Sequence, residues 1–327
     1  MLEPQITVII PTYNRYECIR KLVDECIAVY QGKLFKFEIH DSSDDTTCET
    51  YVKPLASVKY FKYDSSINGD IKTINAMRNA DTPYVYLLGD GFLIDFNKLE
   101  NIISSSDIQN CLIIGVMRVN SYKKYQKRLK DYTFEKGVYS TNDHQKFFYD
   151  FFWYLTLYGG SIIRKDLCEE NECTKKLMTM QSPFVYVCTI FTMLGMLSGG
   201  KKCEFILLDN VMQINPLKGK SGWWVNKKAI EIFCYRYYES VRYLSDIYNT
   251  QNRKFLISHN KYSGLFSFKS VILLRIYGNI TFSILKKYRQ YINKTVPVKN
   301  IIYIWVSLLL PRGILNLIYR IKKRKEI

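Results

Sequence analysis

Acidic residues are nearly absent from the last quarter of this 327-residue chain. Residues 252–327 contain 16 Lys and Arg but a single acid, Glu326, a balance of +15. Residues 1–251 contain 31 Lys and Arg against 29 Asp and Glu, and so add only +2 to the net charge of +17. Such segregation indicates that one end of the molecule meets an anionic surface.

The chain also lacks the cysteine patterns of metal sites and disulfide frameworks. Its nine cysteines include no C-x-x-C pair and no Cys/His cluster, so neither a zinc site nor a disulfide-rich scaffold is indicated. The N-terminus leads into an apolar segment without the basic stretch of a signal peptide. We therefore expect a reducing, cytoplasmic location.

The basic C-terminal segment lacks a long apolar run. Residues 301–310 are mostly apolar, but Pro311 and Arg312 interrupt them, whereas a spanning helix needs about 20 apolar residues. Apolar and aromatic stretches beside clustered cations are typical of an interfacial anchor, in which each cation contributes about 1 kcal/mol near an anionic leaflet. We expect residues 252–327 to bind the cytoplasmic face of the cell membrane, with residues 268–292 in the same plane.

Other interpretations of this basic segment give it a partner other than the membrane. A basic helical subdomain packed on the core is the alternative to a membrane anchor. Nucleic-acid binding is not expected, because the residues between the cations are aliphatic rather than exposed stacking platforms. The sequence leaves the oligomeric state open.

The N-terminal part alternates β-branched apolar runs with helical periodicity. This order predicts right-handed crossovers and a largely parallel α/β sheet. Ligands on such sheets bind beyond the carboxyl ends of the strands. Strands are predicted at residues 6–10 (ended by Pro11), 35–40, 58–63 and 84–88, and helices at residues 17–30, 46–52 and 70–80. Beyond residue 110 we predict a strand at 111–119, a charged loop at 123–136 and helices at 184–197 and 227–248.

Three segments together resemble family 2 glycosyltransferases, which have the GT-A fold. Ile6-Thr7-Val8-Ile9-Ile10-Pro11-Thr12-Tyr13-Asn14-Arg15 is similar to the opening of that family. Residues 84–91, Tyr-Val-Tyr-Leu-Leu-Gly-Asp-Gly, resemble the strand before its Asp-rich metal motif, and residues 158–164 resemble its acceptor-side strand. The resemblance implies a Rossmann-like, mixed, mostly parallel sheet flanked by helices in a catalytic domain of residues 1–225, followed by a helical, basic region of residues 226–327.

The resemblance also implies a nucleotide-sugar site at the turns after these strands. Asp41 would accept hydrogen bonds from a uracil-type base, and the Tyr13 ring would face that base. Cations would meet the diphosphate, since phosphate is bound by charge-assisted hydrogen bonds. The nucleotide-sugar-binding residues so predicted are Pro11, Thr12, Tyr13, Arg15, Asp41, Lys72, Arg78 and Asp90. The three cations have solvated helix charges as their alternative, and Asp44 and Asp45 are expected to cap the helix that follows.

The metal site that the resemblance implies is incomplete. Asp90 would hold Mn²⁺ or Mg²⁺, but Gly91 and Phe92 stand where the family motif has further carboxylates. A divalent ion on a sugar diphosphate prefers two or more hard oxygen ligands from the protein. Three interpretations are open. Asp90, the diphosphate and water together hold the metal; cations such as Lys72 replace the metal; or catalysis is impaired. We favour a weakened or unusual metal site.

A general base is harder to assign. An inverting transfer needs a base for the acceptor hydroxyl, opposite the leaving nucleotide, and the family places an Asp or Glu on the helix below the acceptor. Residues 178–184 hold no acid there. The nearest candidates are Glu170, Glu172, Asp209 and His144, each with a surface role as its alternative. Trp223 and Trp224 are expected to stack on a sugar or close over the donor, unless they pack under the following helix.

The resulting hypothesis is an inverting transfer of a sugar from a nucleoside diphosphate, expected to be UDP, to a lipid-linked saccharide for capsular, O-antigen or cell-wall polysaccharide. A non-catalytic homologue that binds nucleotide sugar or a partner transferase is the first alternative, motivated by the missing acids. A basic membrane- or nucleic-acid-binding protein with a purely structural α/β part is the second.

Overall fold

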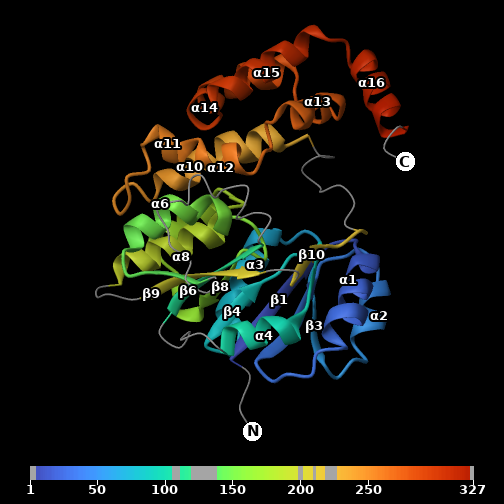
Figure 1. Cartoon of the computed structure of the whole chain (residues 1–327), viewed down its shortest axis with the longest axis vertical. Helices are drawn as coiled ribbons and strands as arrows, with labels where there is room; N and C mark the ends of the chain where they lie inside the picture. Colours follow the sequence, from blue (N-terminus) through green and yellow to red (C-terminus); the bar gives the residue numbers. More distant parts are fainter. Residues whose placement is uncertain are drawn as a thin grey trace. The chain divides into compact units, whose positions relative to one another are not determined.

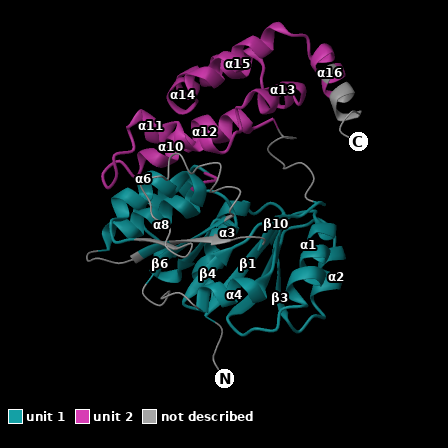
Figure 2. Ribbon diagram, viewed as in Figure 1, with its two compact units in different colours: residues 1–181, 185–219 teal, residues 182–184, 220–327 magenta. Residues whose placement is uncertain are grey.

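The computed structural model describes residues 5–104, 111–118, 138–197, 202–208, 211–217 and 227–324. By its internal contacts the chain divides into two compact units (Figure 2): residues 1–181 with 185–219, and residues 182–184 with 220–327. The predicted boundary between residues 225 and 226 lies within 218–226, outside the described residues.

A mixed, eight-stranded sheet runs through the first unit in the order β3-β2-β1-β4-β8-β6-β9-β7 (Figure 1). Neighbours from β3 to β4 are parallel, β8 is antiparallel to both β4 and β6, β9 is parallel to β6, and β7 is antiparallel to β9. The strands are β1 (Ile6–Thr12), β2 (Phe35–Asp41), β3 (Val58–Lys62), β4 (Tyr84–Leu87), β6 (Cys111–Arg118), β7 (Val138–Thr141), β8 (Ser161–Arg164) and β9 (Lys202–Leu208). The mixed, mostly parallel sheet is therefore confirmed.

Helices flank this sheet, and a small sheet of β5 (Phe92–Ile94) and β10 (Met212–Ile214) lies outside it. Ile6, Val8, Ile9 and Ile10 of β1 are all fully buried, as expected for a parallel strand covered on both faces. The helices of this unit are α1 (Tyr16–Leu22, continued by the π-helix Val23–Ile27), α2 (Thr47–Val52), α3 (Gly69–Asn79), α4 (Phe96–Ser104), α6 (His144–Leu155), the 3-10 helix Lys165–Cys168, α7 (Glu172–Thr179) and α8 (Val185–Met196).

The first strand runs further than the sequence predicts. Pro11 was expected to end it, but β1 continues to Thr12 and pairs with β2 as far as Asp41. Its pairing with β4 ends at Ile9, whose carbonyl accepts the N–H of Leu88. Backbone groups of alternate residues face the same neighbour, so the missing N–H of Pro11 faces the side where pairing has ended and no ladder bond is lost.

The second unit is helical and has its own core, which includes Phe266, Val271, Leu274, Leu285 and Ile304. Its elements are the π-helix Glu231–Arg236, α10 (Tyr237–Arg242), α11 (Arg253–Leu256), α12 (Ser258–Tyr262), α13 (Phe268–Ile276), α14 (Phe282–Thr295), α15 (Val298–Leu309) and α16 (Arg312–Arg324). Among the described residues, we find no helix with the length and apolar character needed to cross a membrane.

The helix predicted at residues 227–248 is shorter than expected. It ends at Arg242, and the chain continues in turns. The N–H groups of Leu244 and Ser245 bond to the carbonyls three residues earlier, at Val241 and Arg242, in place of the α-helical i to i−4 pattern. The apolar periodicity is satisfied by these turns as well, which is why it overestimated the helix.

Candidate functional site

The turn after β1 is joined to the turn after β4 through Asp90. Arg15 Nη1 donates to Asp90 Oδ1 at 2.7 Å, and Thr12 Oγ1 donates to Asp90 Oδ2 at 2.9 Å. The Asp90 side chain is 8% exposed and that of Arg15 is 25% exposed. Thr12 and Arg15 are thus brought into direct contact with Asp90, at least 75 residues away in sequence, and Arg15 lies on the solvent side.

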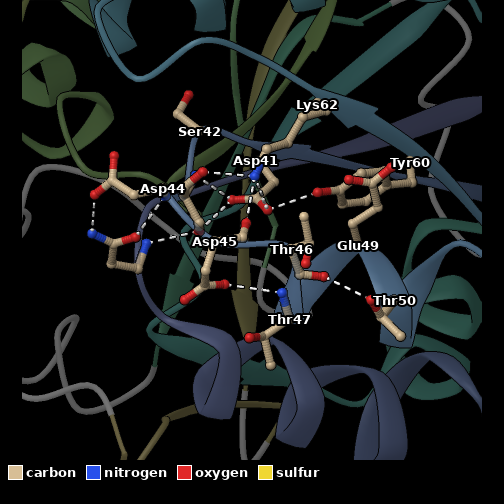
Figure 3. A network of polar contacts seen from close by, with 12 residues as sticks. Asp41, Ser42, Asp44, Asp45, Thr46, Thr47, Glu49, Thr50, Tyr60 and Lys62 are labelled. Atoms are coloured by element: carbon tan, nitrogen blue, oxygen red, sulfur yellow. Dashed lines mark hydrogen bonds and ion pairs between the residues drawn. The ribbon is translucent and has the colours of Figure 1, made fainter.

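The turn after β2 is organised around Asp41, which is fully buried (Figure 3). Its carboxylate accepts from the Ser43 N–H at 2.7 Å, from the Ser43 hydroxyl at 2.5 Å and from the Tyr60 hydroxyl at 2.7 Å, and Lys62 Nζ lies 3.6 Å away. Burial alone would raise the pKa of Asp41, but these hydrogen bonds outweigh it and hold the pKa below its usual value.

Asp41 is therefore directed at its own turn in this structure. Asp41 is predicted to bond to a nucleotide base, but a base would reach this enclosed carboxylate only after the turn rearranged. Lys62 strengthens the same turn, because its Nζ donates to the carbonyls of Ser43 at 2.6 Å and Asp45 at 2.7 Å. We assign Asp41 to holding the turn.

The turns after β1 and β2 are also bonded to each other. The N–H of Asn14 donates to Ser43 Oγ at 2.9 Å, and Asn14 Nδ2 donates to Asp44 Oδ2 at 2.8 Å. Asn14 has a positive φ of 51°, a conformation that Asn adopts more readily than most residues. The Tyr13 hydroxyl donates to Asp44 at 3.0 Å while the residue stays 53% exposed. The Tyr13 ring is thus fixed at the surface of the joined turns.

The aspartates of this turn have different partners. Asp45 Oδ1 accepts from the Thr47 N–H at 3.0 Å at the start of α2 (Figure 3), as predicted for a capping residue. Asp44 was expected to do the same, but it bonds to Tyr13 and Asn14 instead. Its role is to join two turns.

Lys72 of α3 binds the end of β2 and the turn that follows it. Its Nζ donates to Ser42 Oγ at 2.6 Å and to the His40 carbonyl at 3.1 Å, and the residue is only 4% exposed. Burial lowers the pKa of Lys72 to about 8, against the opposing effect of the Asp41 and Asp90 charges. Because both carboxylates act on this ammonium, Lys72 lies within the field of the Asp90 and Asp41 turns.

Arg78 is not brought to this group. It lies six residues after Lys72 on α3, or about 9 Å along the helix axis. Its Nε donates to the Cys168 carbonyl at 2.8 Å, and its Nη1 lies 3.2 Å from Glu170 Oε2. Arg78 thus links the end of α3 to Cys168 and Glu170, and with its side chain only 16% exposed it is not the solvated helix charge of the alternative either.

A further carboxylate, Asp70, which the sequence motifs do not single out, lies in the first turn of α3. The Tyr158 hydroxyl donates to Asp70 Oδ1 at 3.4 Å, and burial raises the pKa of Asp70 to about 6. The Tyr158 side chain also lies beside the turn that leads to Asp90, since a Cβ on Gly89 would meet Tyr158 Cβ at 3.4 Å. Asp70 directly follows the turn at the end of β3, and this position was the signal for it.

The structure describes Glu170, Glu172 and His144 among the predicted base candidates. Glu172 begins α7 with its side chain 77% exposed and paired with Lys175 at 3.0 Å. His144 is the first residue of α6 and directly follows the N-cap residue, Asp143. Asp209 lies outside the described residues, as do Trp223 and Trp224, so their predicted roles stay predictions.

The donor set does not fit a divalent cation. Asp90 is already bound to Arg15 and Thr12, and the nearby Asp95 accepts from the Lys98 N–H at 2.9 Å to cap α4. Within the described ranges, no group of three or more His, Cys, Asp or Glu side chains is placed to hold a metal. The carboxylate that the sequence analysis assigned to a metal is neutralised by an arginine.

Several solved structures are similar to this chain. They include S. aureus TarS 1–349 in complex with UDP-GlcNAc, at a TM-score of 0.48 and 15% identity over 90% of this chain and 82% of that chain. Mannosyltransferase PcManGT from Pyrobaculum calidifontis in complex with GDP-Man and Mn²⁺ gives a TM-score of 0.49 and 16% identity over 94% of this chain and 88% of that chain. The chain spans 50% of a longer S. aureus TarS chain, at a TM-score of 0.49 and 14% identity over 90% of its own length.

No protein-family model and no curated protein matches the chain. The structural matches above have identities of 14–16% and TM-scores below 0.5. We therefore infer the ligand of the site from the residues of this chain.

Proposed function

We propose that this chain is an inverting glycosyltransferase of the GT-A fold that transfers a sugar from a nucleoside diphosphate, UDP in the first instance, to a lipid-linked saccharide of a surface polysaccharide. The observation that supports this is the convergence of the turns after β1, β2 and β4: Arg15 binds Asp90, Asn14 binds Ser43, and Lys72 binds Ser42. Ligands of open α/β sheets bind at such a convergence of strand ends.

The roles follow from exposure and charge. The exposed Tyr13 ring offers a flat apolar face to a nucleotide base. Arg15 is accessible from solvent and carries the planar fork that suits phosphate oxygens, and Lys72, bound to Ser42, adds a second positive charge. Thr12 and Asp90 hold Arg15 in place.

Asp70 is the residue we assign as general base. Its raised pKa of about 6 suits a group that is ionised at neutral pH and still basic enough to take a proton. In the proposed step, an acceptor hydroxyl passes its proton to Asp70 while its oxygen forms the new bond to the anomeric carbon, and the bond to the nucleotide phosphate breaks. Tyr158 orients the carboxylate from the segment that resembles an acceptor-side strand.

Ligand-induced thermal stabilisation of the full chain tests the proposal. UDP or a UDP-sugar at about 100 times its Kd should stabilise the fold by about 2.7 kcal/mol, whereas uridine, which lacks the diphosphate, should stabilise it much less. Hydrolysis of the nucleotide sugar would add evidence of turnover. If no nucleoside diphosphate or nucleotide sugar raises the Tm, the proposed function is wrong.

A second candidate is a non-catalytic homologue that binds nucleotide sugar. It is favoured by the engagement of Asp90 with Arg15 and by the lack of a predicted base within the described site. It shares the expected stabilisation by UDP but predicts no donor hydrolysis and no transfer to any acceptor. Turnover by the wild type, lost in Asp70→Asn, would exclude it.

We further propose that the second unit binds the cytoplasmic, anionic surface of the cell membrane. Side chains of α15 at helical spacing are exposed although apolar, from 37% for Trp305 to 80% for Leu309. The others on this helix are Val298, Ile302 and Val306, and Leu310, Ile314 and Leu317 follow toward and along α16. Exposed apolar side chains on helices rich in Lys and Arg favour insertion between lipid headgroups, with the cations at the phosphates.

Vesicle sedimentation tests this placement. The chain should bind vesicles that contain anionic phosphatidylglycerol and leave phosphatidylcholine vesicles largely in solution, with binding weakened by salt. Equal binding to both would contradict the electrostatic part, and no binding to either would contradict the membrane proposal as a whole.

A further inference from the structure

We infer that this chain binds the diphosphate of its nucleotide without a divalent cation, and that the Arg15 guanidinium held by Asp90 supplies the positive charge in its place. The inference deepens the proposed function and depends on it, since it concerns how the same site holds the donor.

The geometry at Asp90 is the first step. Both carboxylate oxygens are engaged, Oδ1 by Arg15 at 2.7 Å and Oδ2 by Thr12 at 2.9 Å, and the residue is 6% exposed. A cation that took Asp90 as a ligand would have to displace the guanidinium from a charge-assisted hydrogen bond. Such bonds are about twice as strong as those between neutral groups.

The composition of the turn is the second step. Mg²⁺ takes six oxygen ligands in near-octahedral geometry, and Mn²⁺ is likewise held by carboxylates and other oxygens. Asp90 is followed by Gly91 and Phe92, which offer no side-chain oxygen. Asp95 is turned to the N–H groups of α4. A metal bound here would have a single carboxylate of this turn, and that carboxylate is already neutralised.

The supply of positive charge is the third step. Arg15 lies at the start of α1 with its side chain 25% exposed, so a phosphate can approach it from solvent. The buried Lys72 ammonium contributes a second charge close to the Asp90 turn. Both cations lie in the field of carboxylates, so what they offer a diphosphate is a set of charged N–H donors already held in place, above all the planar guanidinium of Arg15, and neither donor has to be recruited from solution.

Calorimetric titration of the full-length protein with UDP, and with GDP in parallel, tests the inference. In wild type, the Kd in EDTA should agree within about twofold with the Kd in Mn²⁺ or Mg²⁺. Arg15→Gln should weaken binding in EDTA about tenfold or more, because a hydrogen bond to a charged group is lost. Arg20→Gln is the matched control: it removes the same charge from an exposed α1 residue paired with Glu17 at 3.0 Å, and its Kd should stay within about twofold of wild type.

The outcomes separate the inference from the proposed function. Binding by wild type only when a divalent cation is present overturns the inference and leaves the proposed function standing. Binding in EDTA that Arg15→Gln does not weaken overturns the role of Arg15. Failure of every nucleoside diphosphate to bind, with and without metal, overturns the proposed function itself. The wild-type comparison decides metal dependence even if Arg15→Gln fails to fold.

Discussion

Many cations of the first unit stand beside carboxylates, whereas residues 252–327 of the second unit contain a single acid. In the first unit Arg15 is bound to Asp90 and Lys62 lies beside Asp41, so carboxylates determine where each positive charge stands. In the second unit Lys294 donates to the Tyr238 hydroxyl at 2.8 Å and lies 4.3 Å from the centre of that ring, and Arg312 donates to the Ile276 carbonyl at 3.0 Å.

This difference shows that net charge and charge placement are separate properties. Paired cations of the first unit build a local geometry with little net charge, which suits recognition of one ligand. Cations held by rings and carbonyls keep their full charge, so residues 252–327 produce a field that acts on any extended anionic surface.

The largest effect is expected from removing the carboxylate that organises the first unit. Asp90→Ala leaves Arg15 and Thr12 without their acceptor in a largely buried place. We expect a loss of about 3 kcal/mol in the free energy of unfolding, measured by urea denaturation. Glu17→Ala, which breaks the exposed pair with Arg20, should cost less than about 1 kcal/mol. Equal losses in the two variants would contradict the contrast between buried and exposed pairs.

A comparable test in the second unit measures membrane binding rather than the free energy of unfolding. Ile302→Ser with Leu309→Ser removes two exposed apolar side chains of α15, which should weaken binding to anionic vesicles by about 2 kcal/mol with the fold unchanged. Val29→Ser in the first unit removes an equally exposed apolar side chain and should leave vesicle binding as in wild type. Unchanged binding by the α15 variant would show that charge alone recruits the chain.

Asp70 gives a prediction that depends on pH. Its pKa in the folded protein is raised to about 6, so between pH 4 and pH 6 the folded state binds more protons than the unfolded state. Stability from this group is therefore present at low pH and is lost as pH rises through 6. Relative to Asp70→Asn, wild type should gain about 2 kcal/mol in unfolding free energy from pH 7 to pH 4.5.

Asp64→Asn is the control for this titration. Hydrogen bonds from Ser66 lower the pKa of Asp64, so its contribution to stability should change with pH in the opposite direction. Asp70→Asn should also abolish sugar transfer while nucleotide binding persists. Full transfer activity in this variant would contradict the assignment of Asp70 as the base.

The smallest effect is expected at the second turn. Lys62→Met removes the bonds to the Ser43 and Asp45 carbonyls and the charge beside Asp41, and should cost about 1 kcal/mol in unfolding free energy. Lys53→Met breaks only an exposed pair with Glu49 on α2 and should cost about 0.5 kcal/mol or less. If Lys62→Met loses no more unfolding free energy than Lys53→Met, Asp41 holds this turn without help from Lys62.

Much of the fold was predictable because apolar patterns reflect burial directly. Ile6–Ile10 is a continuous β-branched and apolar run, and only a strand covered on both faces buries such a run completely. Element ends were less predictable, as at Pro11, because whether a missing N–H matters depends on the neighbour at that point of the sheet.

Within the candidate site, the residue types were predictable but their partners were not. Lys72 and Arg78 share helix α3 and the same charge, yet one reaches Ser42 and the other the Cys168 carbonyl. Asp70 has a sequence signal in its position after β3, but its contact with Tyr158, 88 residues away, is what distinguishes it from an ordinary helix-start aspartate.

The sequence by itself determined the succession of strands and helices up to residue 88, the strand ends that carry the polar side chains, and the concentration of positive charge after residue 251. Only the tertiary structure decided that Asp90 is neutralised by Arg15, that Asp41 is enclosed by its own turn, and that Asp70 lies beside Tyr158. The physical reason is that local patterns record whether a residue is buried, whereas ion pairs depend on which distant strands become neighbours, as β1 and β4 do across 75 residues.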